Sequence, residues 1–291
     1  MCKVSHMNKN SESKLLEKLY KILPWPEDPS TKEGYNRFVE SVNVFKKVVR
    51  HEWFNELVKG RSKINIIDVC GGTGIGGVAL GKVLRDDLGL NIKLTIIDMR
   101  ESALSKAKEF TKKVLGIEAE IIIHDVRKKL NLGGSFDVAL LWGYTTPHFN
   151  PWDMMRVLAN IASLLRSNGL YIYDETDRVY SIFTVMGYKE VIVEKANSDK
   201  LVLTVHKGRE FKTGYMVRAV IDLLNREYVE MKVYFWDLAS SAAFTWIFFD
   251  DVDFIPLERP YRGVILAKQP RRIISIDELL KSKPKVLAEL K

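Results

Sequence analysis

The stretch that decides the fold of this chain is INIIDVCGGTGIGG, residues 64–77. Its apolar first half predicts a buried strand, and the glycines that follow let the backbone turn sharply and approach a ligand too closely for any Cβ. The periodic stretch from Val78 to Leu88 predicts a helix whose N-terminus faces that ligand. A strand, a glycine-rich loop and a helix in this order predict a site for a nucleotide-type cofactor.

Two classes of cofactor fit such a loop. Gly72, Gly74 and Gly77 satisfy the spacing G-x-G-x-x-G, which in an NAD-dependent oxidoreductase places a pyrophosphate on the N-terminus of the helix. Asp68 argues against NAD, because it puts a carboxylate at the end of the strand, just before the glycines. That charge would repel a pyrophosphate, so NAD stays the second hypothesis.

The pattern Asp-x-x-x-Gly-Thr-Gly, residues 68–74, resembles the first motif of the class I S-adenosylmethionine-dependent methyltransferases. The resemblance implies that the loop wraps the zwitterionic amino-acid tail of S-adenosylmethionine and that Asp68 serves its ammonium group. Cys70 departs from the family pattern, since a glycine usually stands at that position. We interpret this cysteine as a small packing residue rather than as a reactive one.

Two further acids extend the resemblance. The stretch 94–98 predicts a second strand that ends in Asp98, 21 residues after Gly77, where a carboxylate that binds ribose hydroxyls is expected in either class. The stretch 119–126 predicts a third strand ending in Asp125. The resemblance implies that this second acid faces the adenine amine.

The remaining landmarks follow in the family's order. We expect a fourth strand over 136–142, a helix over 154–165 and a fifth strand over 170–174, preceded by a Leu-Leu-Arg-x-x-Gly phrase that also resembles the family. The implied fold is α/β, with a Rossmann-like, seven-stranded, mostly parallel sheet. The resemblance further implies cofactor contacts from Gly71, Gly72, Thr73, Gly74, Met99, Val126 and Trp142.

Two regions lie outside this core. Apolar residues at helical spacing over 11–59, broken at Pro24-Trp25-Pro26, predict helices that in this family commonly form a lid over the cofactor. Three apolar stretches, 201–206, 215–223 and 228–235, predict antiparallel strands of a small β insertion, about 200–235. The insertion is either a platform beside the acceptor pocket or an interface in a homodimer.

An apolar helix ending near Phe249 and a hairpin of 250–254 and 263–267 then close the main sheet. The expected parts are a helical lid (1–60), a methyltransferase domain (61–270) and a basic tail (271–291).

Methyl transfer requires little of a protein. The sulfonium is an activated donor, so positioning the acceptor in line and excluding water supply most of the catalysis, and an oxygen or nitrogen acceptor also calls for a base. His148 is the first candidate base, because it is the only imidazole near the C-terminal end of the fourth strand; capping or packing is its alternative role. Tyr144 and Asp174 are further candidates. Tyr35 is the lid residue expected to face the substrate, with packing inside the lid as its alternative.

Missing motifs narrow the acceptor. No Asn/Asp-Pro-Pro-aromatic motif of adenine-N6 methyltransferases follows the fourth strand, and no cysteine stands there to attack a pyrimidine ring. No acid lies between Leu141 and Asp153, which disfavours a magnesium site. A small organic or peptidic acceptor remains the best class. A non-catalytic subunit that only binds S-adenosylmethionine is a third hypothesis.

Composition fits a globular enzyme. The 291 residues carry 45 basic and 37 acidic side chains, a net charge of +8. The basic residues are scattered, so we interpret the excess of positive charge as a solvated surface and do not expect nucleic acid as a partner.

The chain has only two cysteines, Cys2 and Cys70, which predict neither a disulfide framework nor a metal site. No apolar run approaches about 18 residues, and residues 1–10 lack the apolar core of a signal peptide, so we expect a cytoplasmic enzyme without a membrane segment. A single glutamine, Gln269, among many Lys, Arg and Glu is typical of proteins from hot environments.

Overall fold

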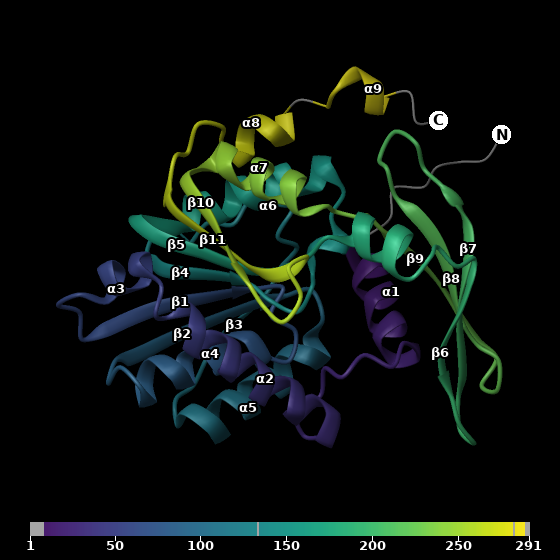
Figure 1. Cartoon of the computed structure of the whole chain (residues 1–291), viewed down its shortest axis with the longest axis horizontal. Coiled ribbons are helices and arrows are strands. Elements are labelled where there is room, and N and C mark those ends of the chain that lie inside the picture. The colour runs from purple at the N-terminus through teal and green to yellow at the C-terminus, as the bar shows by residue number, and fades with distance from the viewer. Residues whose placement is uncertain (1–8, 133, 282, 289–291) are drawn as a thin grey trace.

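A sheet of seven strands forms the centre of the computed structural model, which describes residues 9–132, 134–281 and 283–288 (Figure 1). The strand order is β10-β11-β5-β4-β1-β2-β3, and only β11 runs antiparallel to both of its neighbours. The mostly parallel sheet predicted from the sequence is therefore confirmed. Its strands are β1 (Lys63–Val69), β2 (Asn91–Asp98), β3 (Glu120–Ile123), β4 (Phe136–Leu141), β5 (Leu165–Thr176), β10 (Phe249–Pro256) and β11 (Arg262–Pro270).

Helices cover both faces of this sheet, and each face has its own apolar core. Ile64 and Ile66 of β1 point into one core, whereas Ile67 and Val69 point into the other. This double cover explains why β1 and β4 are apolar without alternation. The first core contains α2 (Lys32–Val48), α3 (Glu52–Val58), α4 (Ile75–Asp86) and α5 (Glu101–Leu115); the second contains α6 (Pro151–Leu164), α7 (Leu238–Phe248) and part of α8 (Ile276–Lys281).

The direction of strand order reverses at β1, because β2 lies on one side of it and β4 on the other. In open parallel sheets the ligand crevice lies at such a switch point, outside the carboxyl ends of the strands. The glycine loop connects β1 to α4 at this point. Helix α4 begins at Ile75, three residues before the predicted Val78, because Gly74 takes the N-cap position with φ +82°.

The N-terminal segment forms α1 (Lys9–Ile22), then α2 and α3. The predicted break at Pro24-Trp25-Pro26 is confirmed, and a second break at residues 49–51 separates α2 from α3. Helix α2 packs on α4, whereas α1 packs on the second sheet of the molecule. The segment from residue 23 to 31, which we call the strap, joins these two helices.

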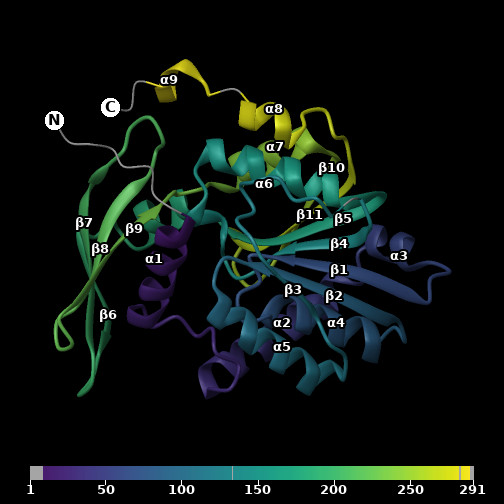
Figure 2. The same cartoon turned by 180° about the vertical axis from the view of Figure 1, so that it is seen from behind.

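The second sheet is small and antiparallel, with the order β6-β7-β8-β9. Figures 1 and 2 show it standing beside the main body, with α1 between the two. Leu19 and Ile22 of α1 pack against Val202, Val220 and Val229 of this sheet. Its strands are β6 (Val191–Ala196), β7 (Leu201–Arg209), β8 (Met216–Asp222) and β9 (Glu227–Val233). The sequence predicted three of these strands and missed β6, whose six residues are all exposed.

Several predicted boundaries were wrong. Strand β3 ends at Ile123, so Asp125 lies in the turn that follows it rather than at the end of the strand. Strand β5 begins at Leu165 rather than at the predicted residue 170, because residues 165–169 continue the strand through an irregular pairing with β4. Helix α6 begins at Pro151, since the Asn150 side chain caps it by accepting from the Asp153 amide.

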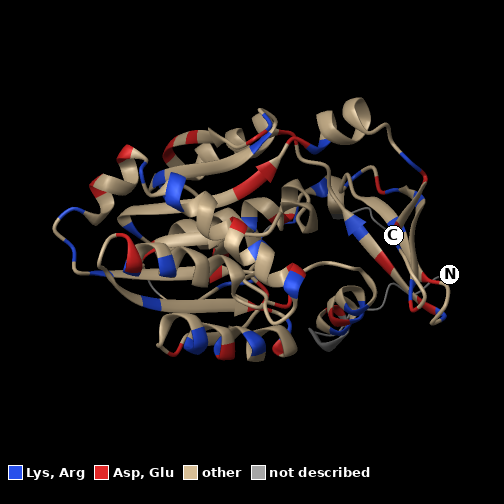
Figure 3. Ribbon diagram, turned by 60° about the horizontal axis from the view of Figure 1, so that its bottom comes forward, with Lys and Arg blue, Asp and Glu red and all other residues tan. Residues whose placement is uncertain are grey.

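Short elements complete the fold: a 3₁₀ turn η1 (Thr146–His148), a π-helical turn η2 (Tyr180–Val185) and α9 (Lys285–Ala288). Basic and acidic residues are mixed along the ribbon rather than separated (Figure 3). Within the described residues, no helix has the length and apolar character needed to cross a membrane. Cys2, most of residues 1–10 and Lys291 of the basic tail lie outside the described residues.

Candidate active site

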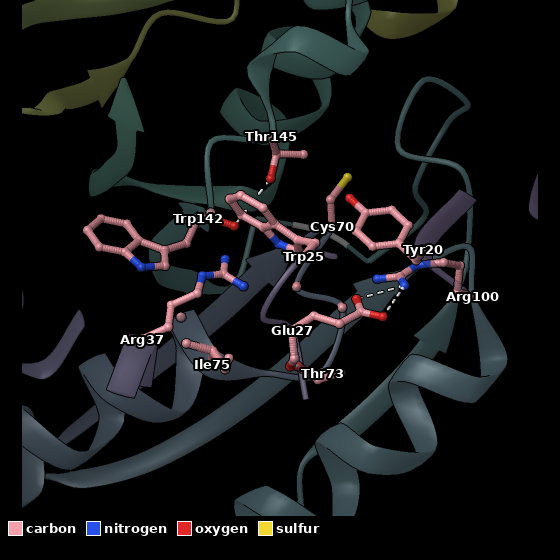
Figure 4. A pocket seen from close by; sticks show the side chains of 14 residues that line it. Tyr20, Trp25, Glu27, Arg37, Cys70, Thr73, Ile75, Arg100, Trp142 and Thr145 are labelled. Atoms are coloured by element: carbon pink, nitrogen blue, oxygen red, sulfur yellow. Dashed lines mark hydrogen bonds and ion pairs between the residues drawn. The ribbon is translucent and has the colours of Figure 1, made fainter. Parts of the chain in front are cut away.

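A hollow lies at the carboxyl ends of β1, β2 and β4, between the glycine loop and the N-terminal segment (Figure 4). Its volume of about 30 Å³ is room for about two water molecules. The hollow is lined by Tyr20, Trp25, Glu27, Arg37, Cys70, Gly71, Gly72, Thr73, Ile75, Gly76, Arg100, Trp142, Gly143 and Thr145. Of the residues predicted to contact the cofactor, the lining of this hollow includes Gly71, Gly72, Thr73 and Trp142.

The glycine loop needs residues without side chains. A Cβ on Gly71 would come within 2.7 Å of Asp68 Cγ, and one on Gly76 within 2.6 Å of Trp142 Cβ. Gly72 and Gly74 both have positive φ. Cys70 also takes the left-handed conformation, with φ 56°, which costs a non-glycine residue about 1–2 kcal/mol. This strain gives a physical reason why the family usually has glycine at that position.

Asp68 is fully buried beneath the loop. Its Oδ2 accepts a 2.7 Å hydrogen bond from the Gly77 amide, whereas Oδ1 has no partner among the described residues. Burial raises the pKa of Asp68 to about 7. A buried carboxylate oxygen without a donor is costly, and a ligand's ammonium group is a fitting partner for it.

Asp98 supports the glycine loop directly. Its Oδ2 accepts from the Gly72 amide at 2.9 Å, and its Oδ1 accepts from the Arg100 amide at 2.9 Å. The Arg100 guanidinium lies beside the same carboxylate, with 3.5 Å between Nε and Oδ1. Asp98 therefore lies at the end of β2, where the sequence predicted a carboxylate that binds the ribose hydroxyls. In this structure both of its oxygens accept hydrogen bonds from amides of the protein.

Asp125 does not line the hollow. It accepts from Arg127 Nε and Nη2 at 2.8 and 3.0 Å. Burial alone would raise its pKa, but these hydrogen bonds and the charge of Arg127 lower it. The neighbouring candidates also bind within the protein: the Met99 carbonyl accepts from Ser13 of α1, and the Val126 carbonyl accepts from Asn160 of α6.

The N-terminal segment supplies four residues of the hollow that the sequence analysis missed as site residues: Tyr20, Trp25, Glu27 and Arg37. Figure 4 shows the last three turned toward the same hollow. The available signals were an isolated tryptophan between two prolines and an arginine two residues after Tyr35. Neither signal identifies a ligand contact without the fold.

Arg37 is a half-buried cation at the edge of the hollow. Its guanidinium lies 4.8 Å from the Trp25 ring centroid and donates a long 3.4 Å hydrogen bond to the Pro26 carbonyl. Among the described residues no carboxylate forms an ion pair with it, although Asp174 and Asp68 lie near enough to interact electrostatically. A Cβ on Gly143 would overlap this guanidinium. Arg37 therefore suits an anionic group in the hollow.

The loop after β4 forms the opposite wall. Gly143 has φ 102° and Tyr144 φ 55°, and Asp174 Oδ1 accepts from both of their amides, at 2.8 and 3.0 Å. Burial raises the pKa of Asp174 to about 6. The Tyr144 hydroxyl hydrogen-bonds Arg262 of β11. Asp174 thus holds a strained loop beside the hollow, and Tyr144 is directed to the β11 side.

His148 lies in η1, behind this wall. Its Nε2 is 3.3 Å from the Tyr20 hydroxyl of α1. Burial and the positive charges of Arg100, Arg178 and Arg127 lower the pKa of His148 to about 4, whereas burial raises that of Tyr20 to about 12. His148 is therefore neutral at pH 7 and can accept a proton.

Tyr35 lies elsewhere. Its side chain is 52% exposed and contacts the Phe38 ring, with 5.8 Å between centroids, and it does not line the hollow. Tyr20 of α1 is the tyrosine of the N-terminal segment that lines the hollow. No group of three or more His, Cys, Asp or Glu suited to a metal occurs among the described residues.

Comparisons with known proteins agree with this geometry. Residues 66–169 match the family model of the methyltransferase domain, the segment that carries Asp68, the glycine loop, Asp98 and the loop after β4. No curated protein matches the sequence significantly.

Solved structures share the fold at low identity. One is a protein from Pyrococcus horikoshii, with 17% identity and a TM-score of 0.60, covering 87% of this chain and 99% of that one. Another is the CcbJ methyltransferase from Streptomyces caelestis, with 12% identity, a TM-score of 0.54 and coverage of 75% and 86%. A third is an S-adenosylmethionine-dependent methyltransferase from Clostridium acetobutylicum, with 14% identity, a TM-score of 0.51 and coverage of 81% and 98%. By the methyltransferase domain at residues 66–169, the chain is an S-adenosylmethionine-dependent methyltransferase, and its fold is the one that these solved structures share.

Proposed function

We propose that this enzyme methylates an oxygen or nitrogen atom of a small organic or peptidic acceptor. The observation that carries the proposal is the neutral, half-buried His148 beside Tyr20, at the point where α1 meets the loop after β4. The hollow beside these elements is small, which favours a compact acceptor over a polymer. The acceptor would approach past Thr145 and Tyr20, which both line the hollow.

Two charges match the amino-acid tail of the cofactor, Arg37 in the lining of the hollow and Asp68 buried beneath its glycine loop. The unpaired Asp68 Oδ1 suits the ammonium group, and Arg37 suits the carboxylate. Amides of the Gly71–Gly74 loop would enclose the chain between these charges. Asp98, at the end of β2, would receive the ribose hydroxyls. S-adenosylmethionine supplies a methyl group already activated by its sulfonium.

The protein then has three tasks. Trp25 and Tyr20 cover the hollow and exclude water, which favours transfer to the acceptor over side reactions. Asp174 holds Gly143 and Tyr144 in place through their amides, so the wall facing the acceptor is fixed. His148 Nε2 takes the proton that the acceptor loses, since its low pKa leaves the ring neutral.

A radiolabel experiment tests the acceptor class. The intact protein is incubated with methyl-labelled S-adenosylmethionine and a cell extract that has been separated into small-molecule, peptide, protein and nucleic-acid fractions. The proposal expects labelled products in the small-molecule or peptide fraction, and a strong loss of label with His148→Ala. Label confined to nucleic acid or to large proteins would contradict the proposed acceptor class.

A further inference from the structure

Both acids predicted to serve the adenosine half of the cofactor are followed two residues later by an arginine. Asp98 is followed by Arg100, and Asp125 by Arg127. Each arginine binds its own acid and also a glutamate of the N-terminal segment. The chain therefore contains two Asp-x-Arg units with the same arrangement, after β2 and after β3.

The first unit ties the strap to the hollow. Arg100 Nη1 lies 3.0 and 2.8 Å from the two carboxylate oxygens of Glu27. Its guanidinium carbon lies 3.9 Å from the Tyr20 ring centroid. The Arg100 side chain is 5% exposed and that of Glu27 is 23% exposed, so water screens this pair only partly. Thr73 of the glycine loop also donates to the Glu27 carbonyl.

The second unit ties α1 to the turn after β3. Arg127 Nη2 lies 2.7 Å from Glu12 Oε1, while Nε and Nη2 hold Asp125. Glu12 stands near the start of α1 and Glu27 in the strap beyond its end. The two ion pairs thus hold the segment at both ends across the carboxyl ends of β2 and β3.

We propose that Glu12–Arg127 and Glu27–Arg100 form a two-point ionic latch that must open before S-adenosylmethionine can reach the glycine loop. The hollow between strap and loop has room for only about two water molecules, and Glu27 and Arg100 line it themselves. Release of both glutamates loosens the strap and α1 from the ends of β2 and β3, while α1 keeps its packing on the small sheet and α2 stays packed on α4. This inference concerns the admission of the cofactor and does not depend on the acceptor proposed above.

Stopped-flow fluorescence of the full-length protein mixed with S-adenosylhomocysteine tests the latch, with Trp25 and Trp142 of the hollow as the signal. The variants are Glu12→Gln, Glu27→Gln and the double variant. The matched control is Glu17→Gln, which removes the same charge from α1 at a carboxylate that accepts from the neutral Ser102 hydroxyl at 2.6 Å. Circular dichroism checks that each variant folds.

The latch predicts faster association in both single variants and an increase of about tenfold in the double variant, which equals about 1.4 kcal/mol in the opening step. Added salt should speed association of the wild type, because it screens the ion pairs, and should have little effect on the double variant. Hydrogen exchange of the α1 amides should accelerate in the same order. Unchanged association rates in the double variant, or an equal increase in Glu17→Gln, would overturn the proposal.

Discussion

Replacing Asp68 with asparagine tests how the hollow holds the cofactor, because this side chain combines a charge with an unusual environment. The carboxyl group is fully buried, one of its oxygens has no partner among the described residues, and its pKa is raised to about 7. If Asp68 binds the ammonium group, only its ionised form does so. The bound ammonium then keeps the carboxylate ionised, and proton release is coupled to binding.

The sign and size of the effect follow from that pKa. A carboxyl group with a pKa of about 7 is ionised in about one molecule in ten at pH 6 and in about nine in ten at pH 8. Affinity for S-adenosylhomocysteine should therefore rise about tenfold from pH 6 to pH 8 and level off above that. Asp68→Asn removes a hydrogen bond to a charge, worth about 1.5–3 kcal/mol. Its affinity at pH 8 should fall about ten- to a hundredfold, and its pH dependence should disappear.

Isothermal titration calorimetry at several pH values measures both effects, and it also reports the protons released. Asp174→Asn is the matched control, because the pKa of Asp174 is raised to about 6 and its carboxylate accepts from the loop after β4 instead of the glycine loop. The control should keep the rise in affinity between pH 6 and pH 8. A flat profile in the wild type, or the same slope in Asp68→Asn, would refute the assigned role.

Three further substitutions separate the other roles. Arg37→Met should weaken S-adenosylhomocysteine binding about ten- to a hundredfold by removing a charged hydrogen bond, but leave binding of 5′-methylthioadenosine, which lacks the amino-acid tail, unchanged; equal losses for both ligands in calorimetry would exclude a carboxylate contact. Asp98→Ala should weaken both ligands about ten- to a hundredfold, because the Gly72 amide and the ribose lose their acceptor; unchanged affinity would mean that β2 does not serve the ribose. His148→Ala should lower turnover at saturating cofactor without changing cofactor affinity, and wild-type turnover should fall as pH drops through about 4, where His148 becomes charged; full turnover of the variant would assign the base elsewhere.

The parts of the fold that could be predicted from the sequence are those that depend on residues close together in the chain. The apolar run of β1, the glycines after it and the acids at the end of β2 and just after β3 are local signals of this kind, and the predicted seven-stranded, mostly parallel sheet is confirmed. Hydrophobic periodicity also predicted α1, α2 and the closing hairpin. The exposed strand β6 was missed, because its short run Val191-Ile192-Val193 lacks the alternation of a half-buried strand.

The site was harder to predict from the sequence, because its polar and charged side chains pair with residues that are far away in the chain. Glu27 and Arg100 are 73 residues apart in the chain, and Tyr20 and His148 are 128 apart. Arg37 is informative only because the fold places it, half-buried, beside Gly143 without a carboxylate ion-pair partner among the described residues. The roles of Asp125 and Tyr35 stay predictions, and their positions, one paired with Arg127 and the other on the surface, set them apart from the hollow.

The binding preference of the glycine loop tests the central claim most directly. Calorimetry of the intact protein should show S-adenosylhomocysteine binding at micromolar strength or better, and NAD binding at least about tenfold more weakly, since Asp68 repels a pyrophosphate and attracts an ammonium group. Gly72→Val should abolish this binding in a folded protein, because the branched side chain would stand against Arg100 at a position with φ +54°. NAD binding that equals or exceeds that of S-adenosylhomocysteine would contradict the account.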